Sequence, residues 1–273
     1  MIDTGSVVTV DLNADLAEGE VLSAGDLAVL ESVSSVSIAC GFHAGAPGVM
    51  RATASACLER GVTIGAHVSF RDREGFGRRH VDSSPPLLVR DIIEQCEVLA
   101  EQVVAAGGAV TYVKPHGALY NRMGVEPAVA GAVVEAVSHV GIGILVAQPG
   151  TVVVGPAIAG GLRVVSEGFP DRGYLPGGLL APRDRTGALI EDPALVGRRA
   201  VSLAGGRGVV AVDGSWAAVD VETLCVHGDS PHAPEAARSV RHALESAGIT
   251  VLSFAPTDGT DRPPPDGRLS GPS

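Results

Sequence analysis

The most informative part of the chain is the segment Tyr112-Val113-Lys114-Pro115-His116-Gly117-Ala118-Leu119-Tyr120. An apolar run typical of a β-strand ends here in a lysine and a histidine. Lys114 is the only lysine, and all the other residues among the 20 lysines and arginines are arginines. A lysine ammonium is a compact charge that can approach a phosphate or carbonyl oxygen, and its pKa changes readily on burial. This favours a chemical role for Lys114. The alternative is a coding bias that left one lysine by chance.

The same arrangement, a short apolar run followed by polar residues, recurs along the chain. Runs rich in Val and Ile alternate with longer segments of helical periodicity, which is typical of β-α units around a parallel sheet. The expected strands cover residues 7–12, 36–39, 63–66, 111–113, 144–146, 163–166, 223–226 and 250–254. The expected helices cover residues 24–32, 48–60, 86–106, 125–139, 151–159, 193–204 and 233–247. Asp213-Gly214 lies between two apolar runs and predicts a hairpin over residues 209–221.

Nearly every polar residue of chemical interest follows one of these strands. In a parallel β/α barrel the carboxyl ends of the strands open onto one face, and active sites lie on that face. We therefore predict an α/β protein with a variant, TIM-like β/α barrel in a single domain, whose strand ends bring distant residues together. The residues expected there are Asp11, Asn13, Asp15, Glu18, His43, His67, Arg79, Lys114, His116, Tyr120, Asn121, Glu167, Asp171, Arg172, Arg183, His227 and Asp229.

Four histidines of this set follow four different strands, and carboxylates accompany them. Such groups can act as general acids and bases, and together they can hold a divalent cation. The metal ligands suggested by the sequence are Asp11, Asp15, His43 and His67. No compact zinc signature such as H-E-x-x-H occurs, and neither does a phosphate-binding G-x-x-x-x-G-K-[ST] loop. A single histidine after a strand is more often a hydrogen-bonded structural residue than a catalyst. A purely structural role therefore stays open for each of the four histidines.

Composition narrows the functional class. A net charge of −11 argues against non-specific nucleic-acid binding, and the apolar stretches are too short to span a membrane. The four cysteines, Cys40, Cys57, Cys96 and Cys225, are widely spaced, which predicts reduced thiols and a cytoplasmic protein. Residues 1–255 are expected to form the barrel domain. Residues 256–273 are rich in Pro, Gly, Asp and Ser, which predicts a mobile tail.

Seven segments of the chain also resemble the motifs of a known family, the LamB/YcsF family of 5-oxoprolinase A subunits. They run in order from about Val10 to Phe254. They are Asp11-Leu12-Asn13-Ala14-Asp15-Leu16-Ala17-Glu18, Ala39-Cys40-Gly41-Phe42-His43-Ala44-Gly45, Gly65-Ala66-His67, Gly75-Phe76-Gly77-Arg78-Arg79, Val113-Lys114-Pro115-His116-Gly117-Ala118-Leu119-Tyr120, Glu167-Gly168-Phe169-Pro170-Asp171-Arg172 and Cys225-Val226-His227-Gly228-Asp229. The chain departs from the family pattern at Ala14, Ala17, Val68, Phe70 and Gly177.

The resemblance implies a barrel similar to the glycoside hydrolase and deacetylase barrels, and a defined reaction. That reaction is ATP-dependent hydrolysis of 5-oxo-L-proline to L-glutamate by an enzyme that also needs partner subunits B and C. ATP is then the expected cofactor, with Mg²⁺ or another divalent metal as a further candidate. Two alternatives stay open: a metal-dependent hydrolase such as a carbohydrate deacetylase, and a non-catalytic subunit that binds substrate.

On this interpretation the expected catalytic residues are Asp15, His43, Lys114 and His116. Lys114, with Arg172 or Arg183, would contact phosphoryl or carboxylate oxygens. Asp15 or His43 would be a base. The remaining residues of the set would bind substrate, phosphate or a cation, and they are Asn13, Glu18, His67, Arg79, Tyr120, Asn121, Glu167, Asp171, Arg172, Arg183, His227 and Asp229.

Overall fold

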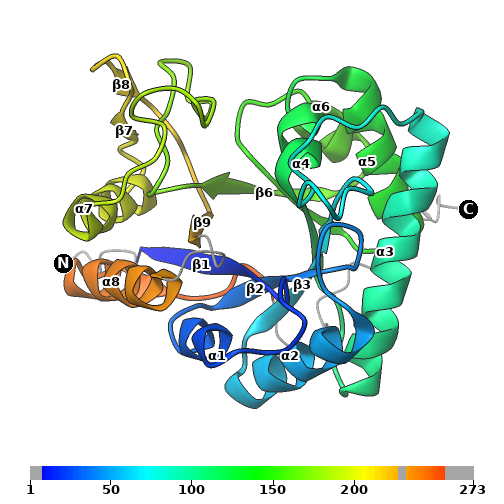
Figure 1. Cartoon of the computed structure of the whole chain (residues 1–273). Coiled ribbons are helices and arrows are strands. Elements are labelled where there is room, and N and C mark those ends of the chain that lie inside the picture. The colour runs from blue at the N-terminus through cyan, green and yellow to red at the C-terminus, as the bar shows by residue number, and fades with distance from the viewer. Residues whose placement is uncertain (1–7, 227–231, 256–273) are drawn as a thin grey trace, which may run out of the picture.

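A computed structural model of the chain describes residues 8–226 and 232–255, and these form a parallel barrel surrounded by helices (Figure 1). Seven strands pair in the order β1-β2-β3-β4-β5-β6-β9, and β9 pairs with β1 to close the sheet, with every pairing parallel. The strands are β1 (Thr9–Leu16), β2 (Ser35–Ala39), β3 (Thr63–Val68), β4 (Tyr112–Pro115), β5 (Ile144–Ala147), β6 (Arg163–Gly168) and β9 (Thr223–Val226). The predicted TIM-like barrel is confirmed.

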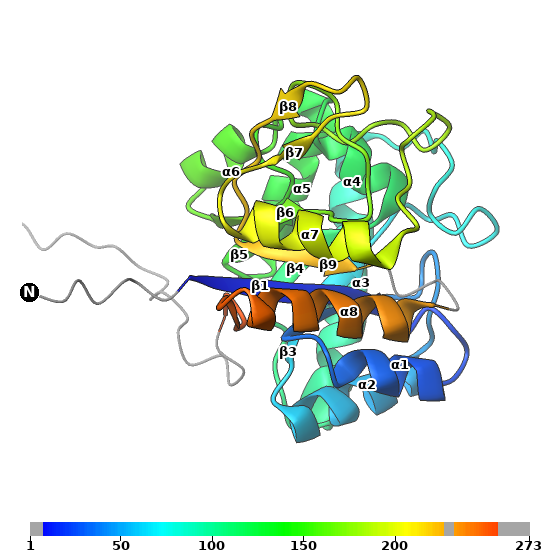
Figure 2. The same cartoon turned by 90° about the vertical axis from the view of Figure 1, so that its left-hand side faces the viewer.

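Helices cover the outside of the barrel, where the apolar outward faces of the strands pack against them. The helices are α1 (Ala24–Leu30), α2 (Pro47–Arg60), α3 (Pro85–Ala105), α4 (Gly117–Met123), α5 (Pro127–His139), α6 (Val154–Ala159), α7 (Pro193–Ala204) and α8 (Ala233–Ser246). Figure 2 shows α7 and α8 lying side by side next to β1 and β9. Of these, only α4 was not predicted, because it is a short helix that directly follows the polar end of β4. None of the helices in the described ranges is long and apolar enough to cross a bilayer.

The predicted hairpin is confirmed as an antiparallel pair, β7 (Val209–Val210) and β8 (Trp216–Ala217). The last predicted strand is shorter than expected, because β10 (Thr250–Val251) only pairs with the first two residues of β1. The predicted tail, residues 256–273, lies outside the described residues.

The first predicted strand was wrong at its end: β1 does not stop at Leu12 but continues to Leu16. Asn13 and Asp15 therefore lie within the strand, like Asp11, rather than after it. A closed sheet allows this because the inward side chains of neighbouring strands supply polar partners. Asp11 accepts hydrogen bonds from Ser34 Oγ at 2.7 Å, Ser35 Oγ at 2.9 Å and Thr223 Oγ1.

Apolar side chains fill much of the amino-terminal end of the barrel, beside the polar group around Asp11. Tyr112 lies inside with Val146 and Val165, and its ring meets Phe254 edge-on at 5.1 Å between centroids. Gly65 on β3 leaves room for this ring, since a Cβ at that position would overlap the ring carbons of Tyr112. The interior of the barrel is thus plugged at this end, whereas the polar strand ends lie at the other.

Candidate active site

A cavity of ≈ 350 Å³ opens at the carboxyl end of the barrel strands. It is bounded by the ends of β1, β3 and β4, by α4 and by the loop that follows β6. Its lining combines carboxylates, histidines and guanidinium groups with aromatic rings. The lining residues are Asp15, Glu18, His67, Arg78, Lys114, Pro115, His116, Gly117, Ala118, Tyr120, Asn121, Phe169, Arg172, Leu180, Pro182 and Arg183.

Lys114 lies at the floor of this cavity and is almost completely buried. Its Nζ is 2.9 Å from Asp15 Oδ1 and 2.8 Å from Glu167 Oε1. The same nitrogen donates hydrogen bonds to Asn13 Oδ1 at 2.9 Å and to Cys225 Sγ at 3.1 Å. Four strands, β1, β4, β6 and β9, therefore meet at one ammonium.

Interactions within this cluster keep both Lys114 and Asp15 ionised although they are buried. Burial would lower the pKa of Lys114, but the carboxylates of Asp15 and Glu167 raise that pKa well above its ordinary value. Burial would raise the pKa of Asp15, but His67 and Lys114 hold it well below its usual range. Asp15 is thus an ionised carboxylate at neutral pH, at the edge of the cavity.

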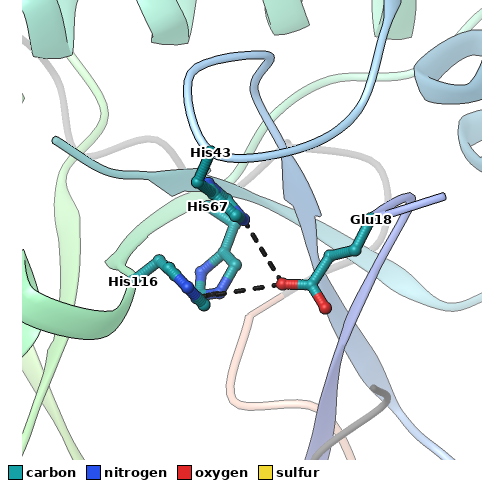
Figure 3. A group of neighbouring side chains, drawn as sticks. All are labelled: Glu18, His43, His67 and His116. Atoms are coloured by element: carbon teal, nitrogen blue, oxygen red, sulfur yellow. Dashed lines mark hydrogen bonds and ion pairs between the residues drawn. The ribbon is translucent and has the colours of Figure 1, made fainter. Parts of the chain in front are cut away.

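Three histidine rings and one carboxylate meet beside Lys114 (Figure 3). His43 Nε2 lies 3.3 Å from Glu18 Oε1, and His116 Nδ1 lies 3.8 Å from the same oxygen. His67 Nε2 is 2.9 Å from His116 Nδ1 and 3.3 Å from Asp15 Oδ2. The ligand-type atoms of Glu18, His43, His67 and His116 all lie within 4.8 Å of one another.

The opposite edge of each ring is fixed by the protein. His43 Nδ1 is 3.0 Å from Ser69 Oγ, His67 Nδ1 is 2.9 Å from the Lys114 carbonyl oxygen, and His116 Nε2 is 2.9 Å from the Phe76 carbonyl oxygen. The rings of His43 and His116 also stack, with centroids 4.0 Å apart. Each inner nitrogen is therefore aimed by a hydrogen bond on the far side of its ring.

The loop that follows β3 supplies part of this support through an unusual backbone. Phe76 has φ 54°, a left-handed conformation, and its ring packs edge-on against His43 and His116. Gly77 has φ 65°, and a Cβ there would lie 2.8 Å from His116 Cδ2 and 2.9 Å from His43 Cβ. The loop fits this closely only because residue 77 has no side chain.

Several predicted residues lie away from the cavity. Asp11 lies four residues before Asp15, roughly 13 Å along β1 and with Asn13 between them, and its oxygens accept hydroxyl hydrogen bonds. The structure therefore does not bring Asp11 to the histidines. Arg79 pairs with Asp72, and its side chain is 58% exposed. The neighbouring Arg78 lines the cavity instead.

The other predicted residues divide into those that reach the cavity and those that support its lining. Arg172 lines the cavity and also fixes the loop after β6, because its Nε and Nη2 donate to the carbonyl oxygens of Ala188 at 3.1 Å and Ala181 at 2.9 Å. Asn13 and Glu167 lie beneath the surface around Lys114. Asp171 follows them on the loop after β6 and is not among the lining residues. Tyr120, Asn121 and Arg183 reach the cavity directly, whereas His227 and Asp229 lie outside the described residues.

The predicted set lacks seven of the lining residues, which are Arg78, Pro115, Gly117, Ala118, Phe169, Leu180 and Pro182. The signal for Arg78 was present in the pair Arg78-Arg79, but sequence alone does not say which of two adjacent arginines turns inward. The four cysteines are free, as predicted, and the structure buries all four. Burial raises the pKa of the Cys225 thiol well above its ordinary value, so this residue is a neutral hydrogen-bond partner of Lys114.

Comparison with known proteins shows the family of the chain. Residues 10–259 match the family model described as the LamB/YcsF family. The chain belongs to the LamB/YcsF family. The 5-oxoprolinase A subunit of Kocuria rhizophila is 47% identical over 252 residues, which cover 91% of this chain and 100% of that relative. The 5-oxoprolinase A subunit of Mycobacterium avium is also 47% identical, over 90% of this chain and 98% of the relative.

A solved structure is similar over nearly the whole barrel. The lactam utilization protein of Thermus thermophilus superposes with a TM-score of 0.85 at 42% identity. The match covers 90% of this chain and 100% of that protein. Membership of the LamB/YcsF family, shown by sequence, is thus accompanied by a shared fold.

Proposed function

We propose that this chain carries the lactam-opening site of a 5-oxoprolinase, an enzyme that converts 5-oxo-L-proline to L-glutamate with hydrolysis of ATP. In this proposal the chain is the A component and acts together with subunits B and C. The names of the similar proteins support this role, since two are named as 5-oxoprolinase A subunits and one as a lactam utilization protein. The observation that carries the proposal is the cavity mouth at which the sole lysine, an ionised aspartate and the histidines converge.

The cavity suits a small anionic lactam. Its volume is at the low end for small-molecule sites, and charged and polar side chains make up much of its lining, together with apolar atoms. Arg78 and Arg183 bring positive charge to the lining, which matches the carboxylate of 5-oxoproline. The sequence has no phosphate-binding glycine loop, so we assign no nucleotide loop to this chain.

The chemistry explains why ATP is needed. Amide resonance makes the lactam carbonyl a poor electrophile, and transfer of the γ-phosphoryl group to its oxygen, with release of ADP, removes that resonance. Water then attacks the same carbon and loses a proton to a base, and the ring C–N bond breaks as the nitrogen takes up a proton. A second water hydrolyses the resulting acyl phosphate to glutamate and phosphate.

Two residues fit the demands of these steps. Asp15 is ionised and at the cavity edge, so it is our choice for the base that accepts the proton of the attacking water. Lys114 holds Asp15 in this state and adds positive charge under the reacting oxygens. His43, the other base considered from the sequence, has its inner nitrogen directed at Glu18 and is not a lining residue, which makes it the weaker choice.

The proposal is tested by reconstitution with subunits B and C from the same organism. We expect glutamate to form from 5-oxo-L-proline only when all three subunits and ATP are present, with one ADP released per glutamate. Glutamate formation by this chain alone, without ATP, would instead establish the second candidate, a metal-dependent amide hydrolase. The cluster of Glu18 with three histidines is the observation that favours that candidate.

A further inference from the structure

We propose that Glu18, His43, His67 and His116 form a binding site for one divalent transition metal ion of the zinc class, at the wall of the cavity. The set differs from the one suggested by the sequence, because Asp11 and Asp15 are absent from it and Glu18 and His116 take their places. The metal binding itself stands apart from the proposed 5-oxoprolinase reaction. Its place in that reaction, next to Asp15, rests on the proposed function.

The hydrogen bonds of the three histidine rings show which ring nitrogens are protonated and which carry lone pairs. The Lys114 and Phe76 carbonyl oxygens can only accept hydrogen bonds, so His67 Nδ1 and His116 Nε2 must be the protonated nitrogens of those rings. The Ser69 hydroxyl donates to the Phe70 carbonyl oxygen at 3.0 Å, so it accepts from His43 Nδ1. In the neutral rings, all three inner nitrogens therefore carry lone pairs.

While the three rings are neutral, these lone pairs face one another and the carboxylate oxygens of Asp15 and Glu18. His67 Nε2 and His116 Nδ1 are only 2.9 Å apart, and Glu18 Oε1 adds a further acceptor within 4 Å of two of the inner nitrogens. Converging acceptors in a buried position repel one another unless a proton or a metal cation lies between them. A divalent ion bound by the inner atoms removes this conflict for all four groups at once.

The donor chemistry and the spacing both suit zinc. Three imidazoles and one carboxylate are a ligand set that fits zinc and its neighbours, whereas magnesium prefers oxygen ligands and water. Ligands about 2.0–2.1 Å from a tetrahedral zinc ion lie about 3.4 Å from one another. The observed separations, from 2.9 Å to at most 4.8 Å, bracket this value.

Each ring is also supported from behind. Metal-binding histidines usually donate their second ring N–H to a carbonyl or another acceptor, which fixes the ring and raises its basicity. His43, His67 and His116 each do so, through a hydroxyl or a backbone carbonyl. Gly77 and Phe76 lock two of the rings from the loop side. These contacts make a rigid site of the kind that binding requires.

The test is zinc binding by the isolated chain after treatment with a chelator, measured by calorimetry and by metal analysis. We expect one zinc per chain with a dissociation constant below about 1 µM, and no displacement by excess Mg²⁺. Cobalt substituted at the same site is expected to give the visible absorption of a four- or five-coordinate ion. The His67→Gln and His116→Gln variants should each weaken binding at least about 100-fold.

The His242→Gln variant is the matched control, because His242 lies on α8, away from the cavity. It should bind zinc like the unaltered chain. Unfolding curves in chelator show whether each variant is folded. The inference is overturned if the unaltered chain takes up no stoichiometric zinc, or if the His67→Gln/His116→Gln double variant, shown to be folded, keeps full affinity. A chain that fails this test but supports ATP-dependent glutamate formation leaves the proposed function standing.

Discussion

Lys114 is the residue on which the charges of the site depend. Its ammonium pairs with Asp15 and Glu167 in a region that is almost completely buried. Replacing it by methionine leaves two buried carboxylates near each other without a cation, which is among the more costly changes in a protein interior. We expect Lys114→Met to lower the free energy of unfolding by roughly 3–5 kcal/mol, measured by urea denaturation.

A second variant tests whether the stability loss of Lys114→Met comes from the uncompensated carboxylates or from lost packing. If the cost comes from uncompensated carboxylates, adding Asp15→Asn and Glu167→Gln to Lys114→Met should recover a large part of the lost stability, because no buried charge then remains in the trio. A triple variant that is less stable than Lys114→Met would show that the carboxylates are not the source of the cost.

Asp11 gives the chain a predictable response to pH. Burial raises its pKa from 3.8 to about 6, although hydroxyl groups donate to it. Its carboxyl therefore binds a proton more tightly in the folded chain than in the unfolded chain, and stability falls as the pH rises between these two values. Relative to Asp11→Asn, the unaltered chain should lose on the order of 2–3 kcal/mol between about pH 4 and about pH 7. An unchanged difference across that range would contradict the assignment.

At the scale of single elements, the loop after β3 controls the histidine rings. Gly77 and Gly61 have the same φ of 65°, but a Cβ at Gly61 meets nothing within 4 Å. Gly61→Ala should therefore cost only the left-handed backbone penalty, about 1–2 kcal/mol. Gly77→Ala should cost more and should also weaken zinc binding at least about tenfold, since its Cβ displaces His43 and His116. Equal effects of the two substitutions on zinc affinity would contradict this role.

Element boundaries show where sequence reasoning succeeds and where it stops. The Val- and Ile-rich runs predicted every barrel strand, because outward-facing apolar residues leave a clear signal. The end of β1 was missed, because Asp11, Asn13 and Asp15 alternate inward into a polar barrel interior, and such residues look like a loop in sequence. The short helix α4 carries too little periodicity to be seen.

At the scale of the whole molecule, the side chains that stabilise the barrel core and those that line the cavity lie at opposite ends of the barrel axis. The apolar plug of Tyr112 and Phe254 lies at the amino end, and the cavity around Lys114 lies at the carboxyl end. Phe254→Ala should therefore lower the free energy of unfolding by roughly 1–3 kcal/mol. At a temperature where the variant is folded, its zinc affinity and KM for 5-oxo-L-proline should stay unchanged. A large change in either value would contradict this separation.

The sequence could predict that the site residues lie close together, because parallel strands bring their carboxyl ends to one face of the barrel. This holds however far apart the residues are in the sequence. The pairing of individual groups could not. Which carboxylate reaches Lys114, and whether Arg78 or Arg79 turns inward, depends on strand register and on loop backbone angles. These are set by packing across the barrel, which sequence patterns do not record.

Asp15 is the residue through which lactam opening at this cavity can be tested most directly. The Asp15→Asn variant keeps one buried carboxylate, Glu167, opposite Lys114, so it should fold and assemble normally. The decisive measurement is its rate of ATP-dependent glutamate formation with subunits B and C. We predict a fall in kcat of at least about 100-fold, as expected for loss of a general base. A rate close to that of the unaltered chain would mean that lactam opening takes place elsewhere.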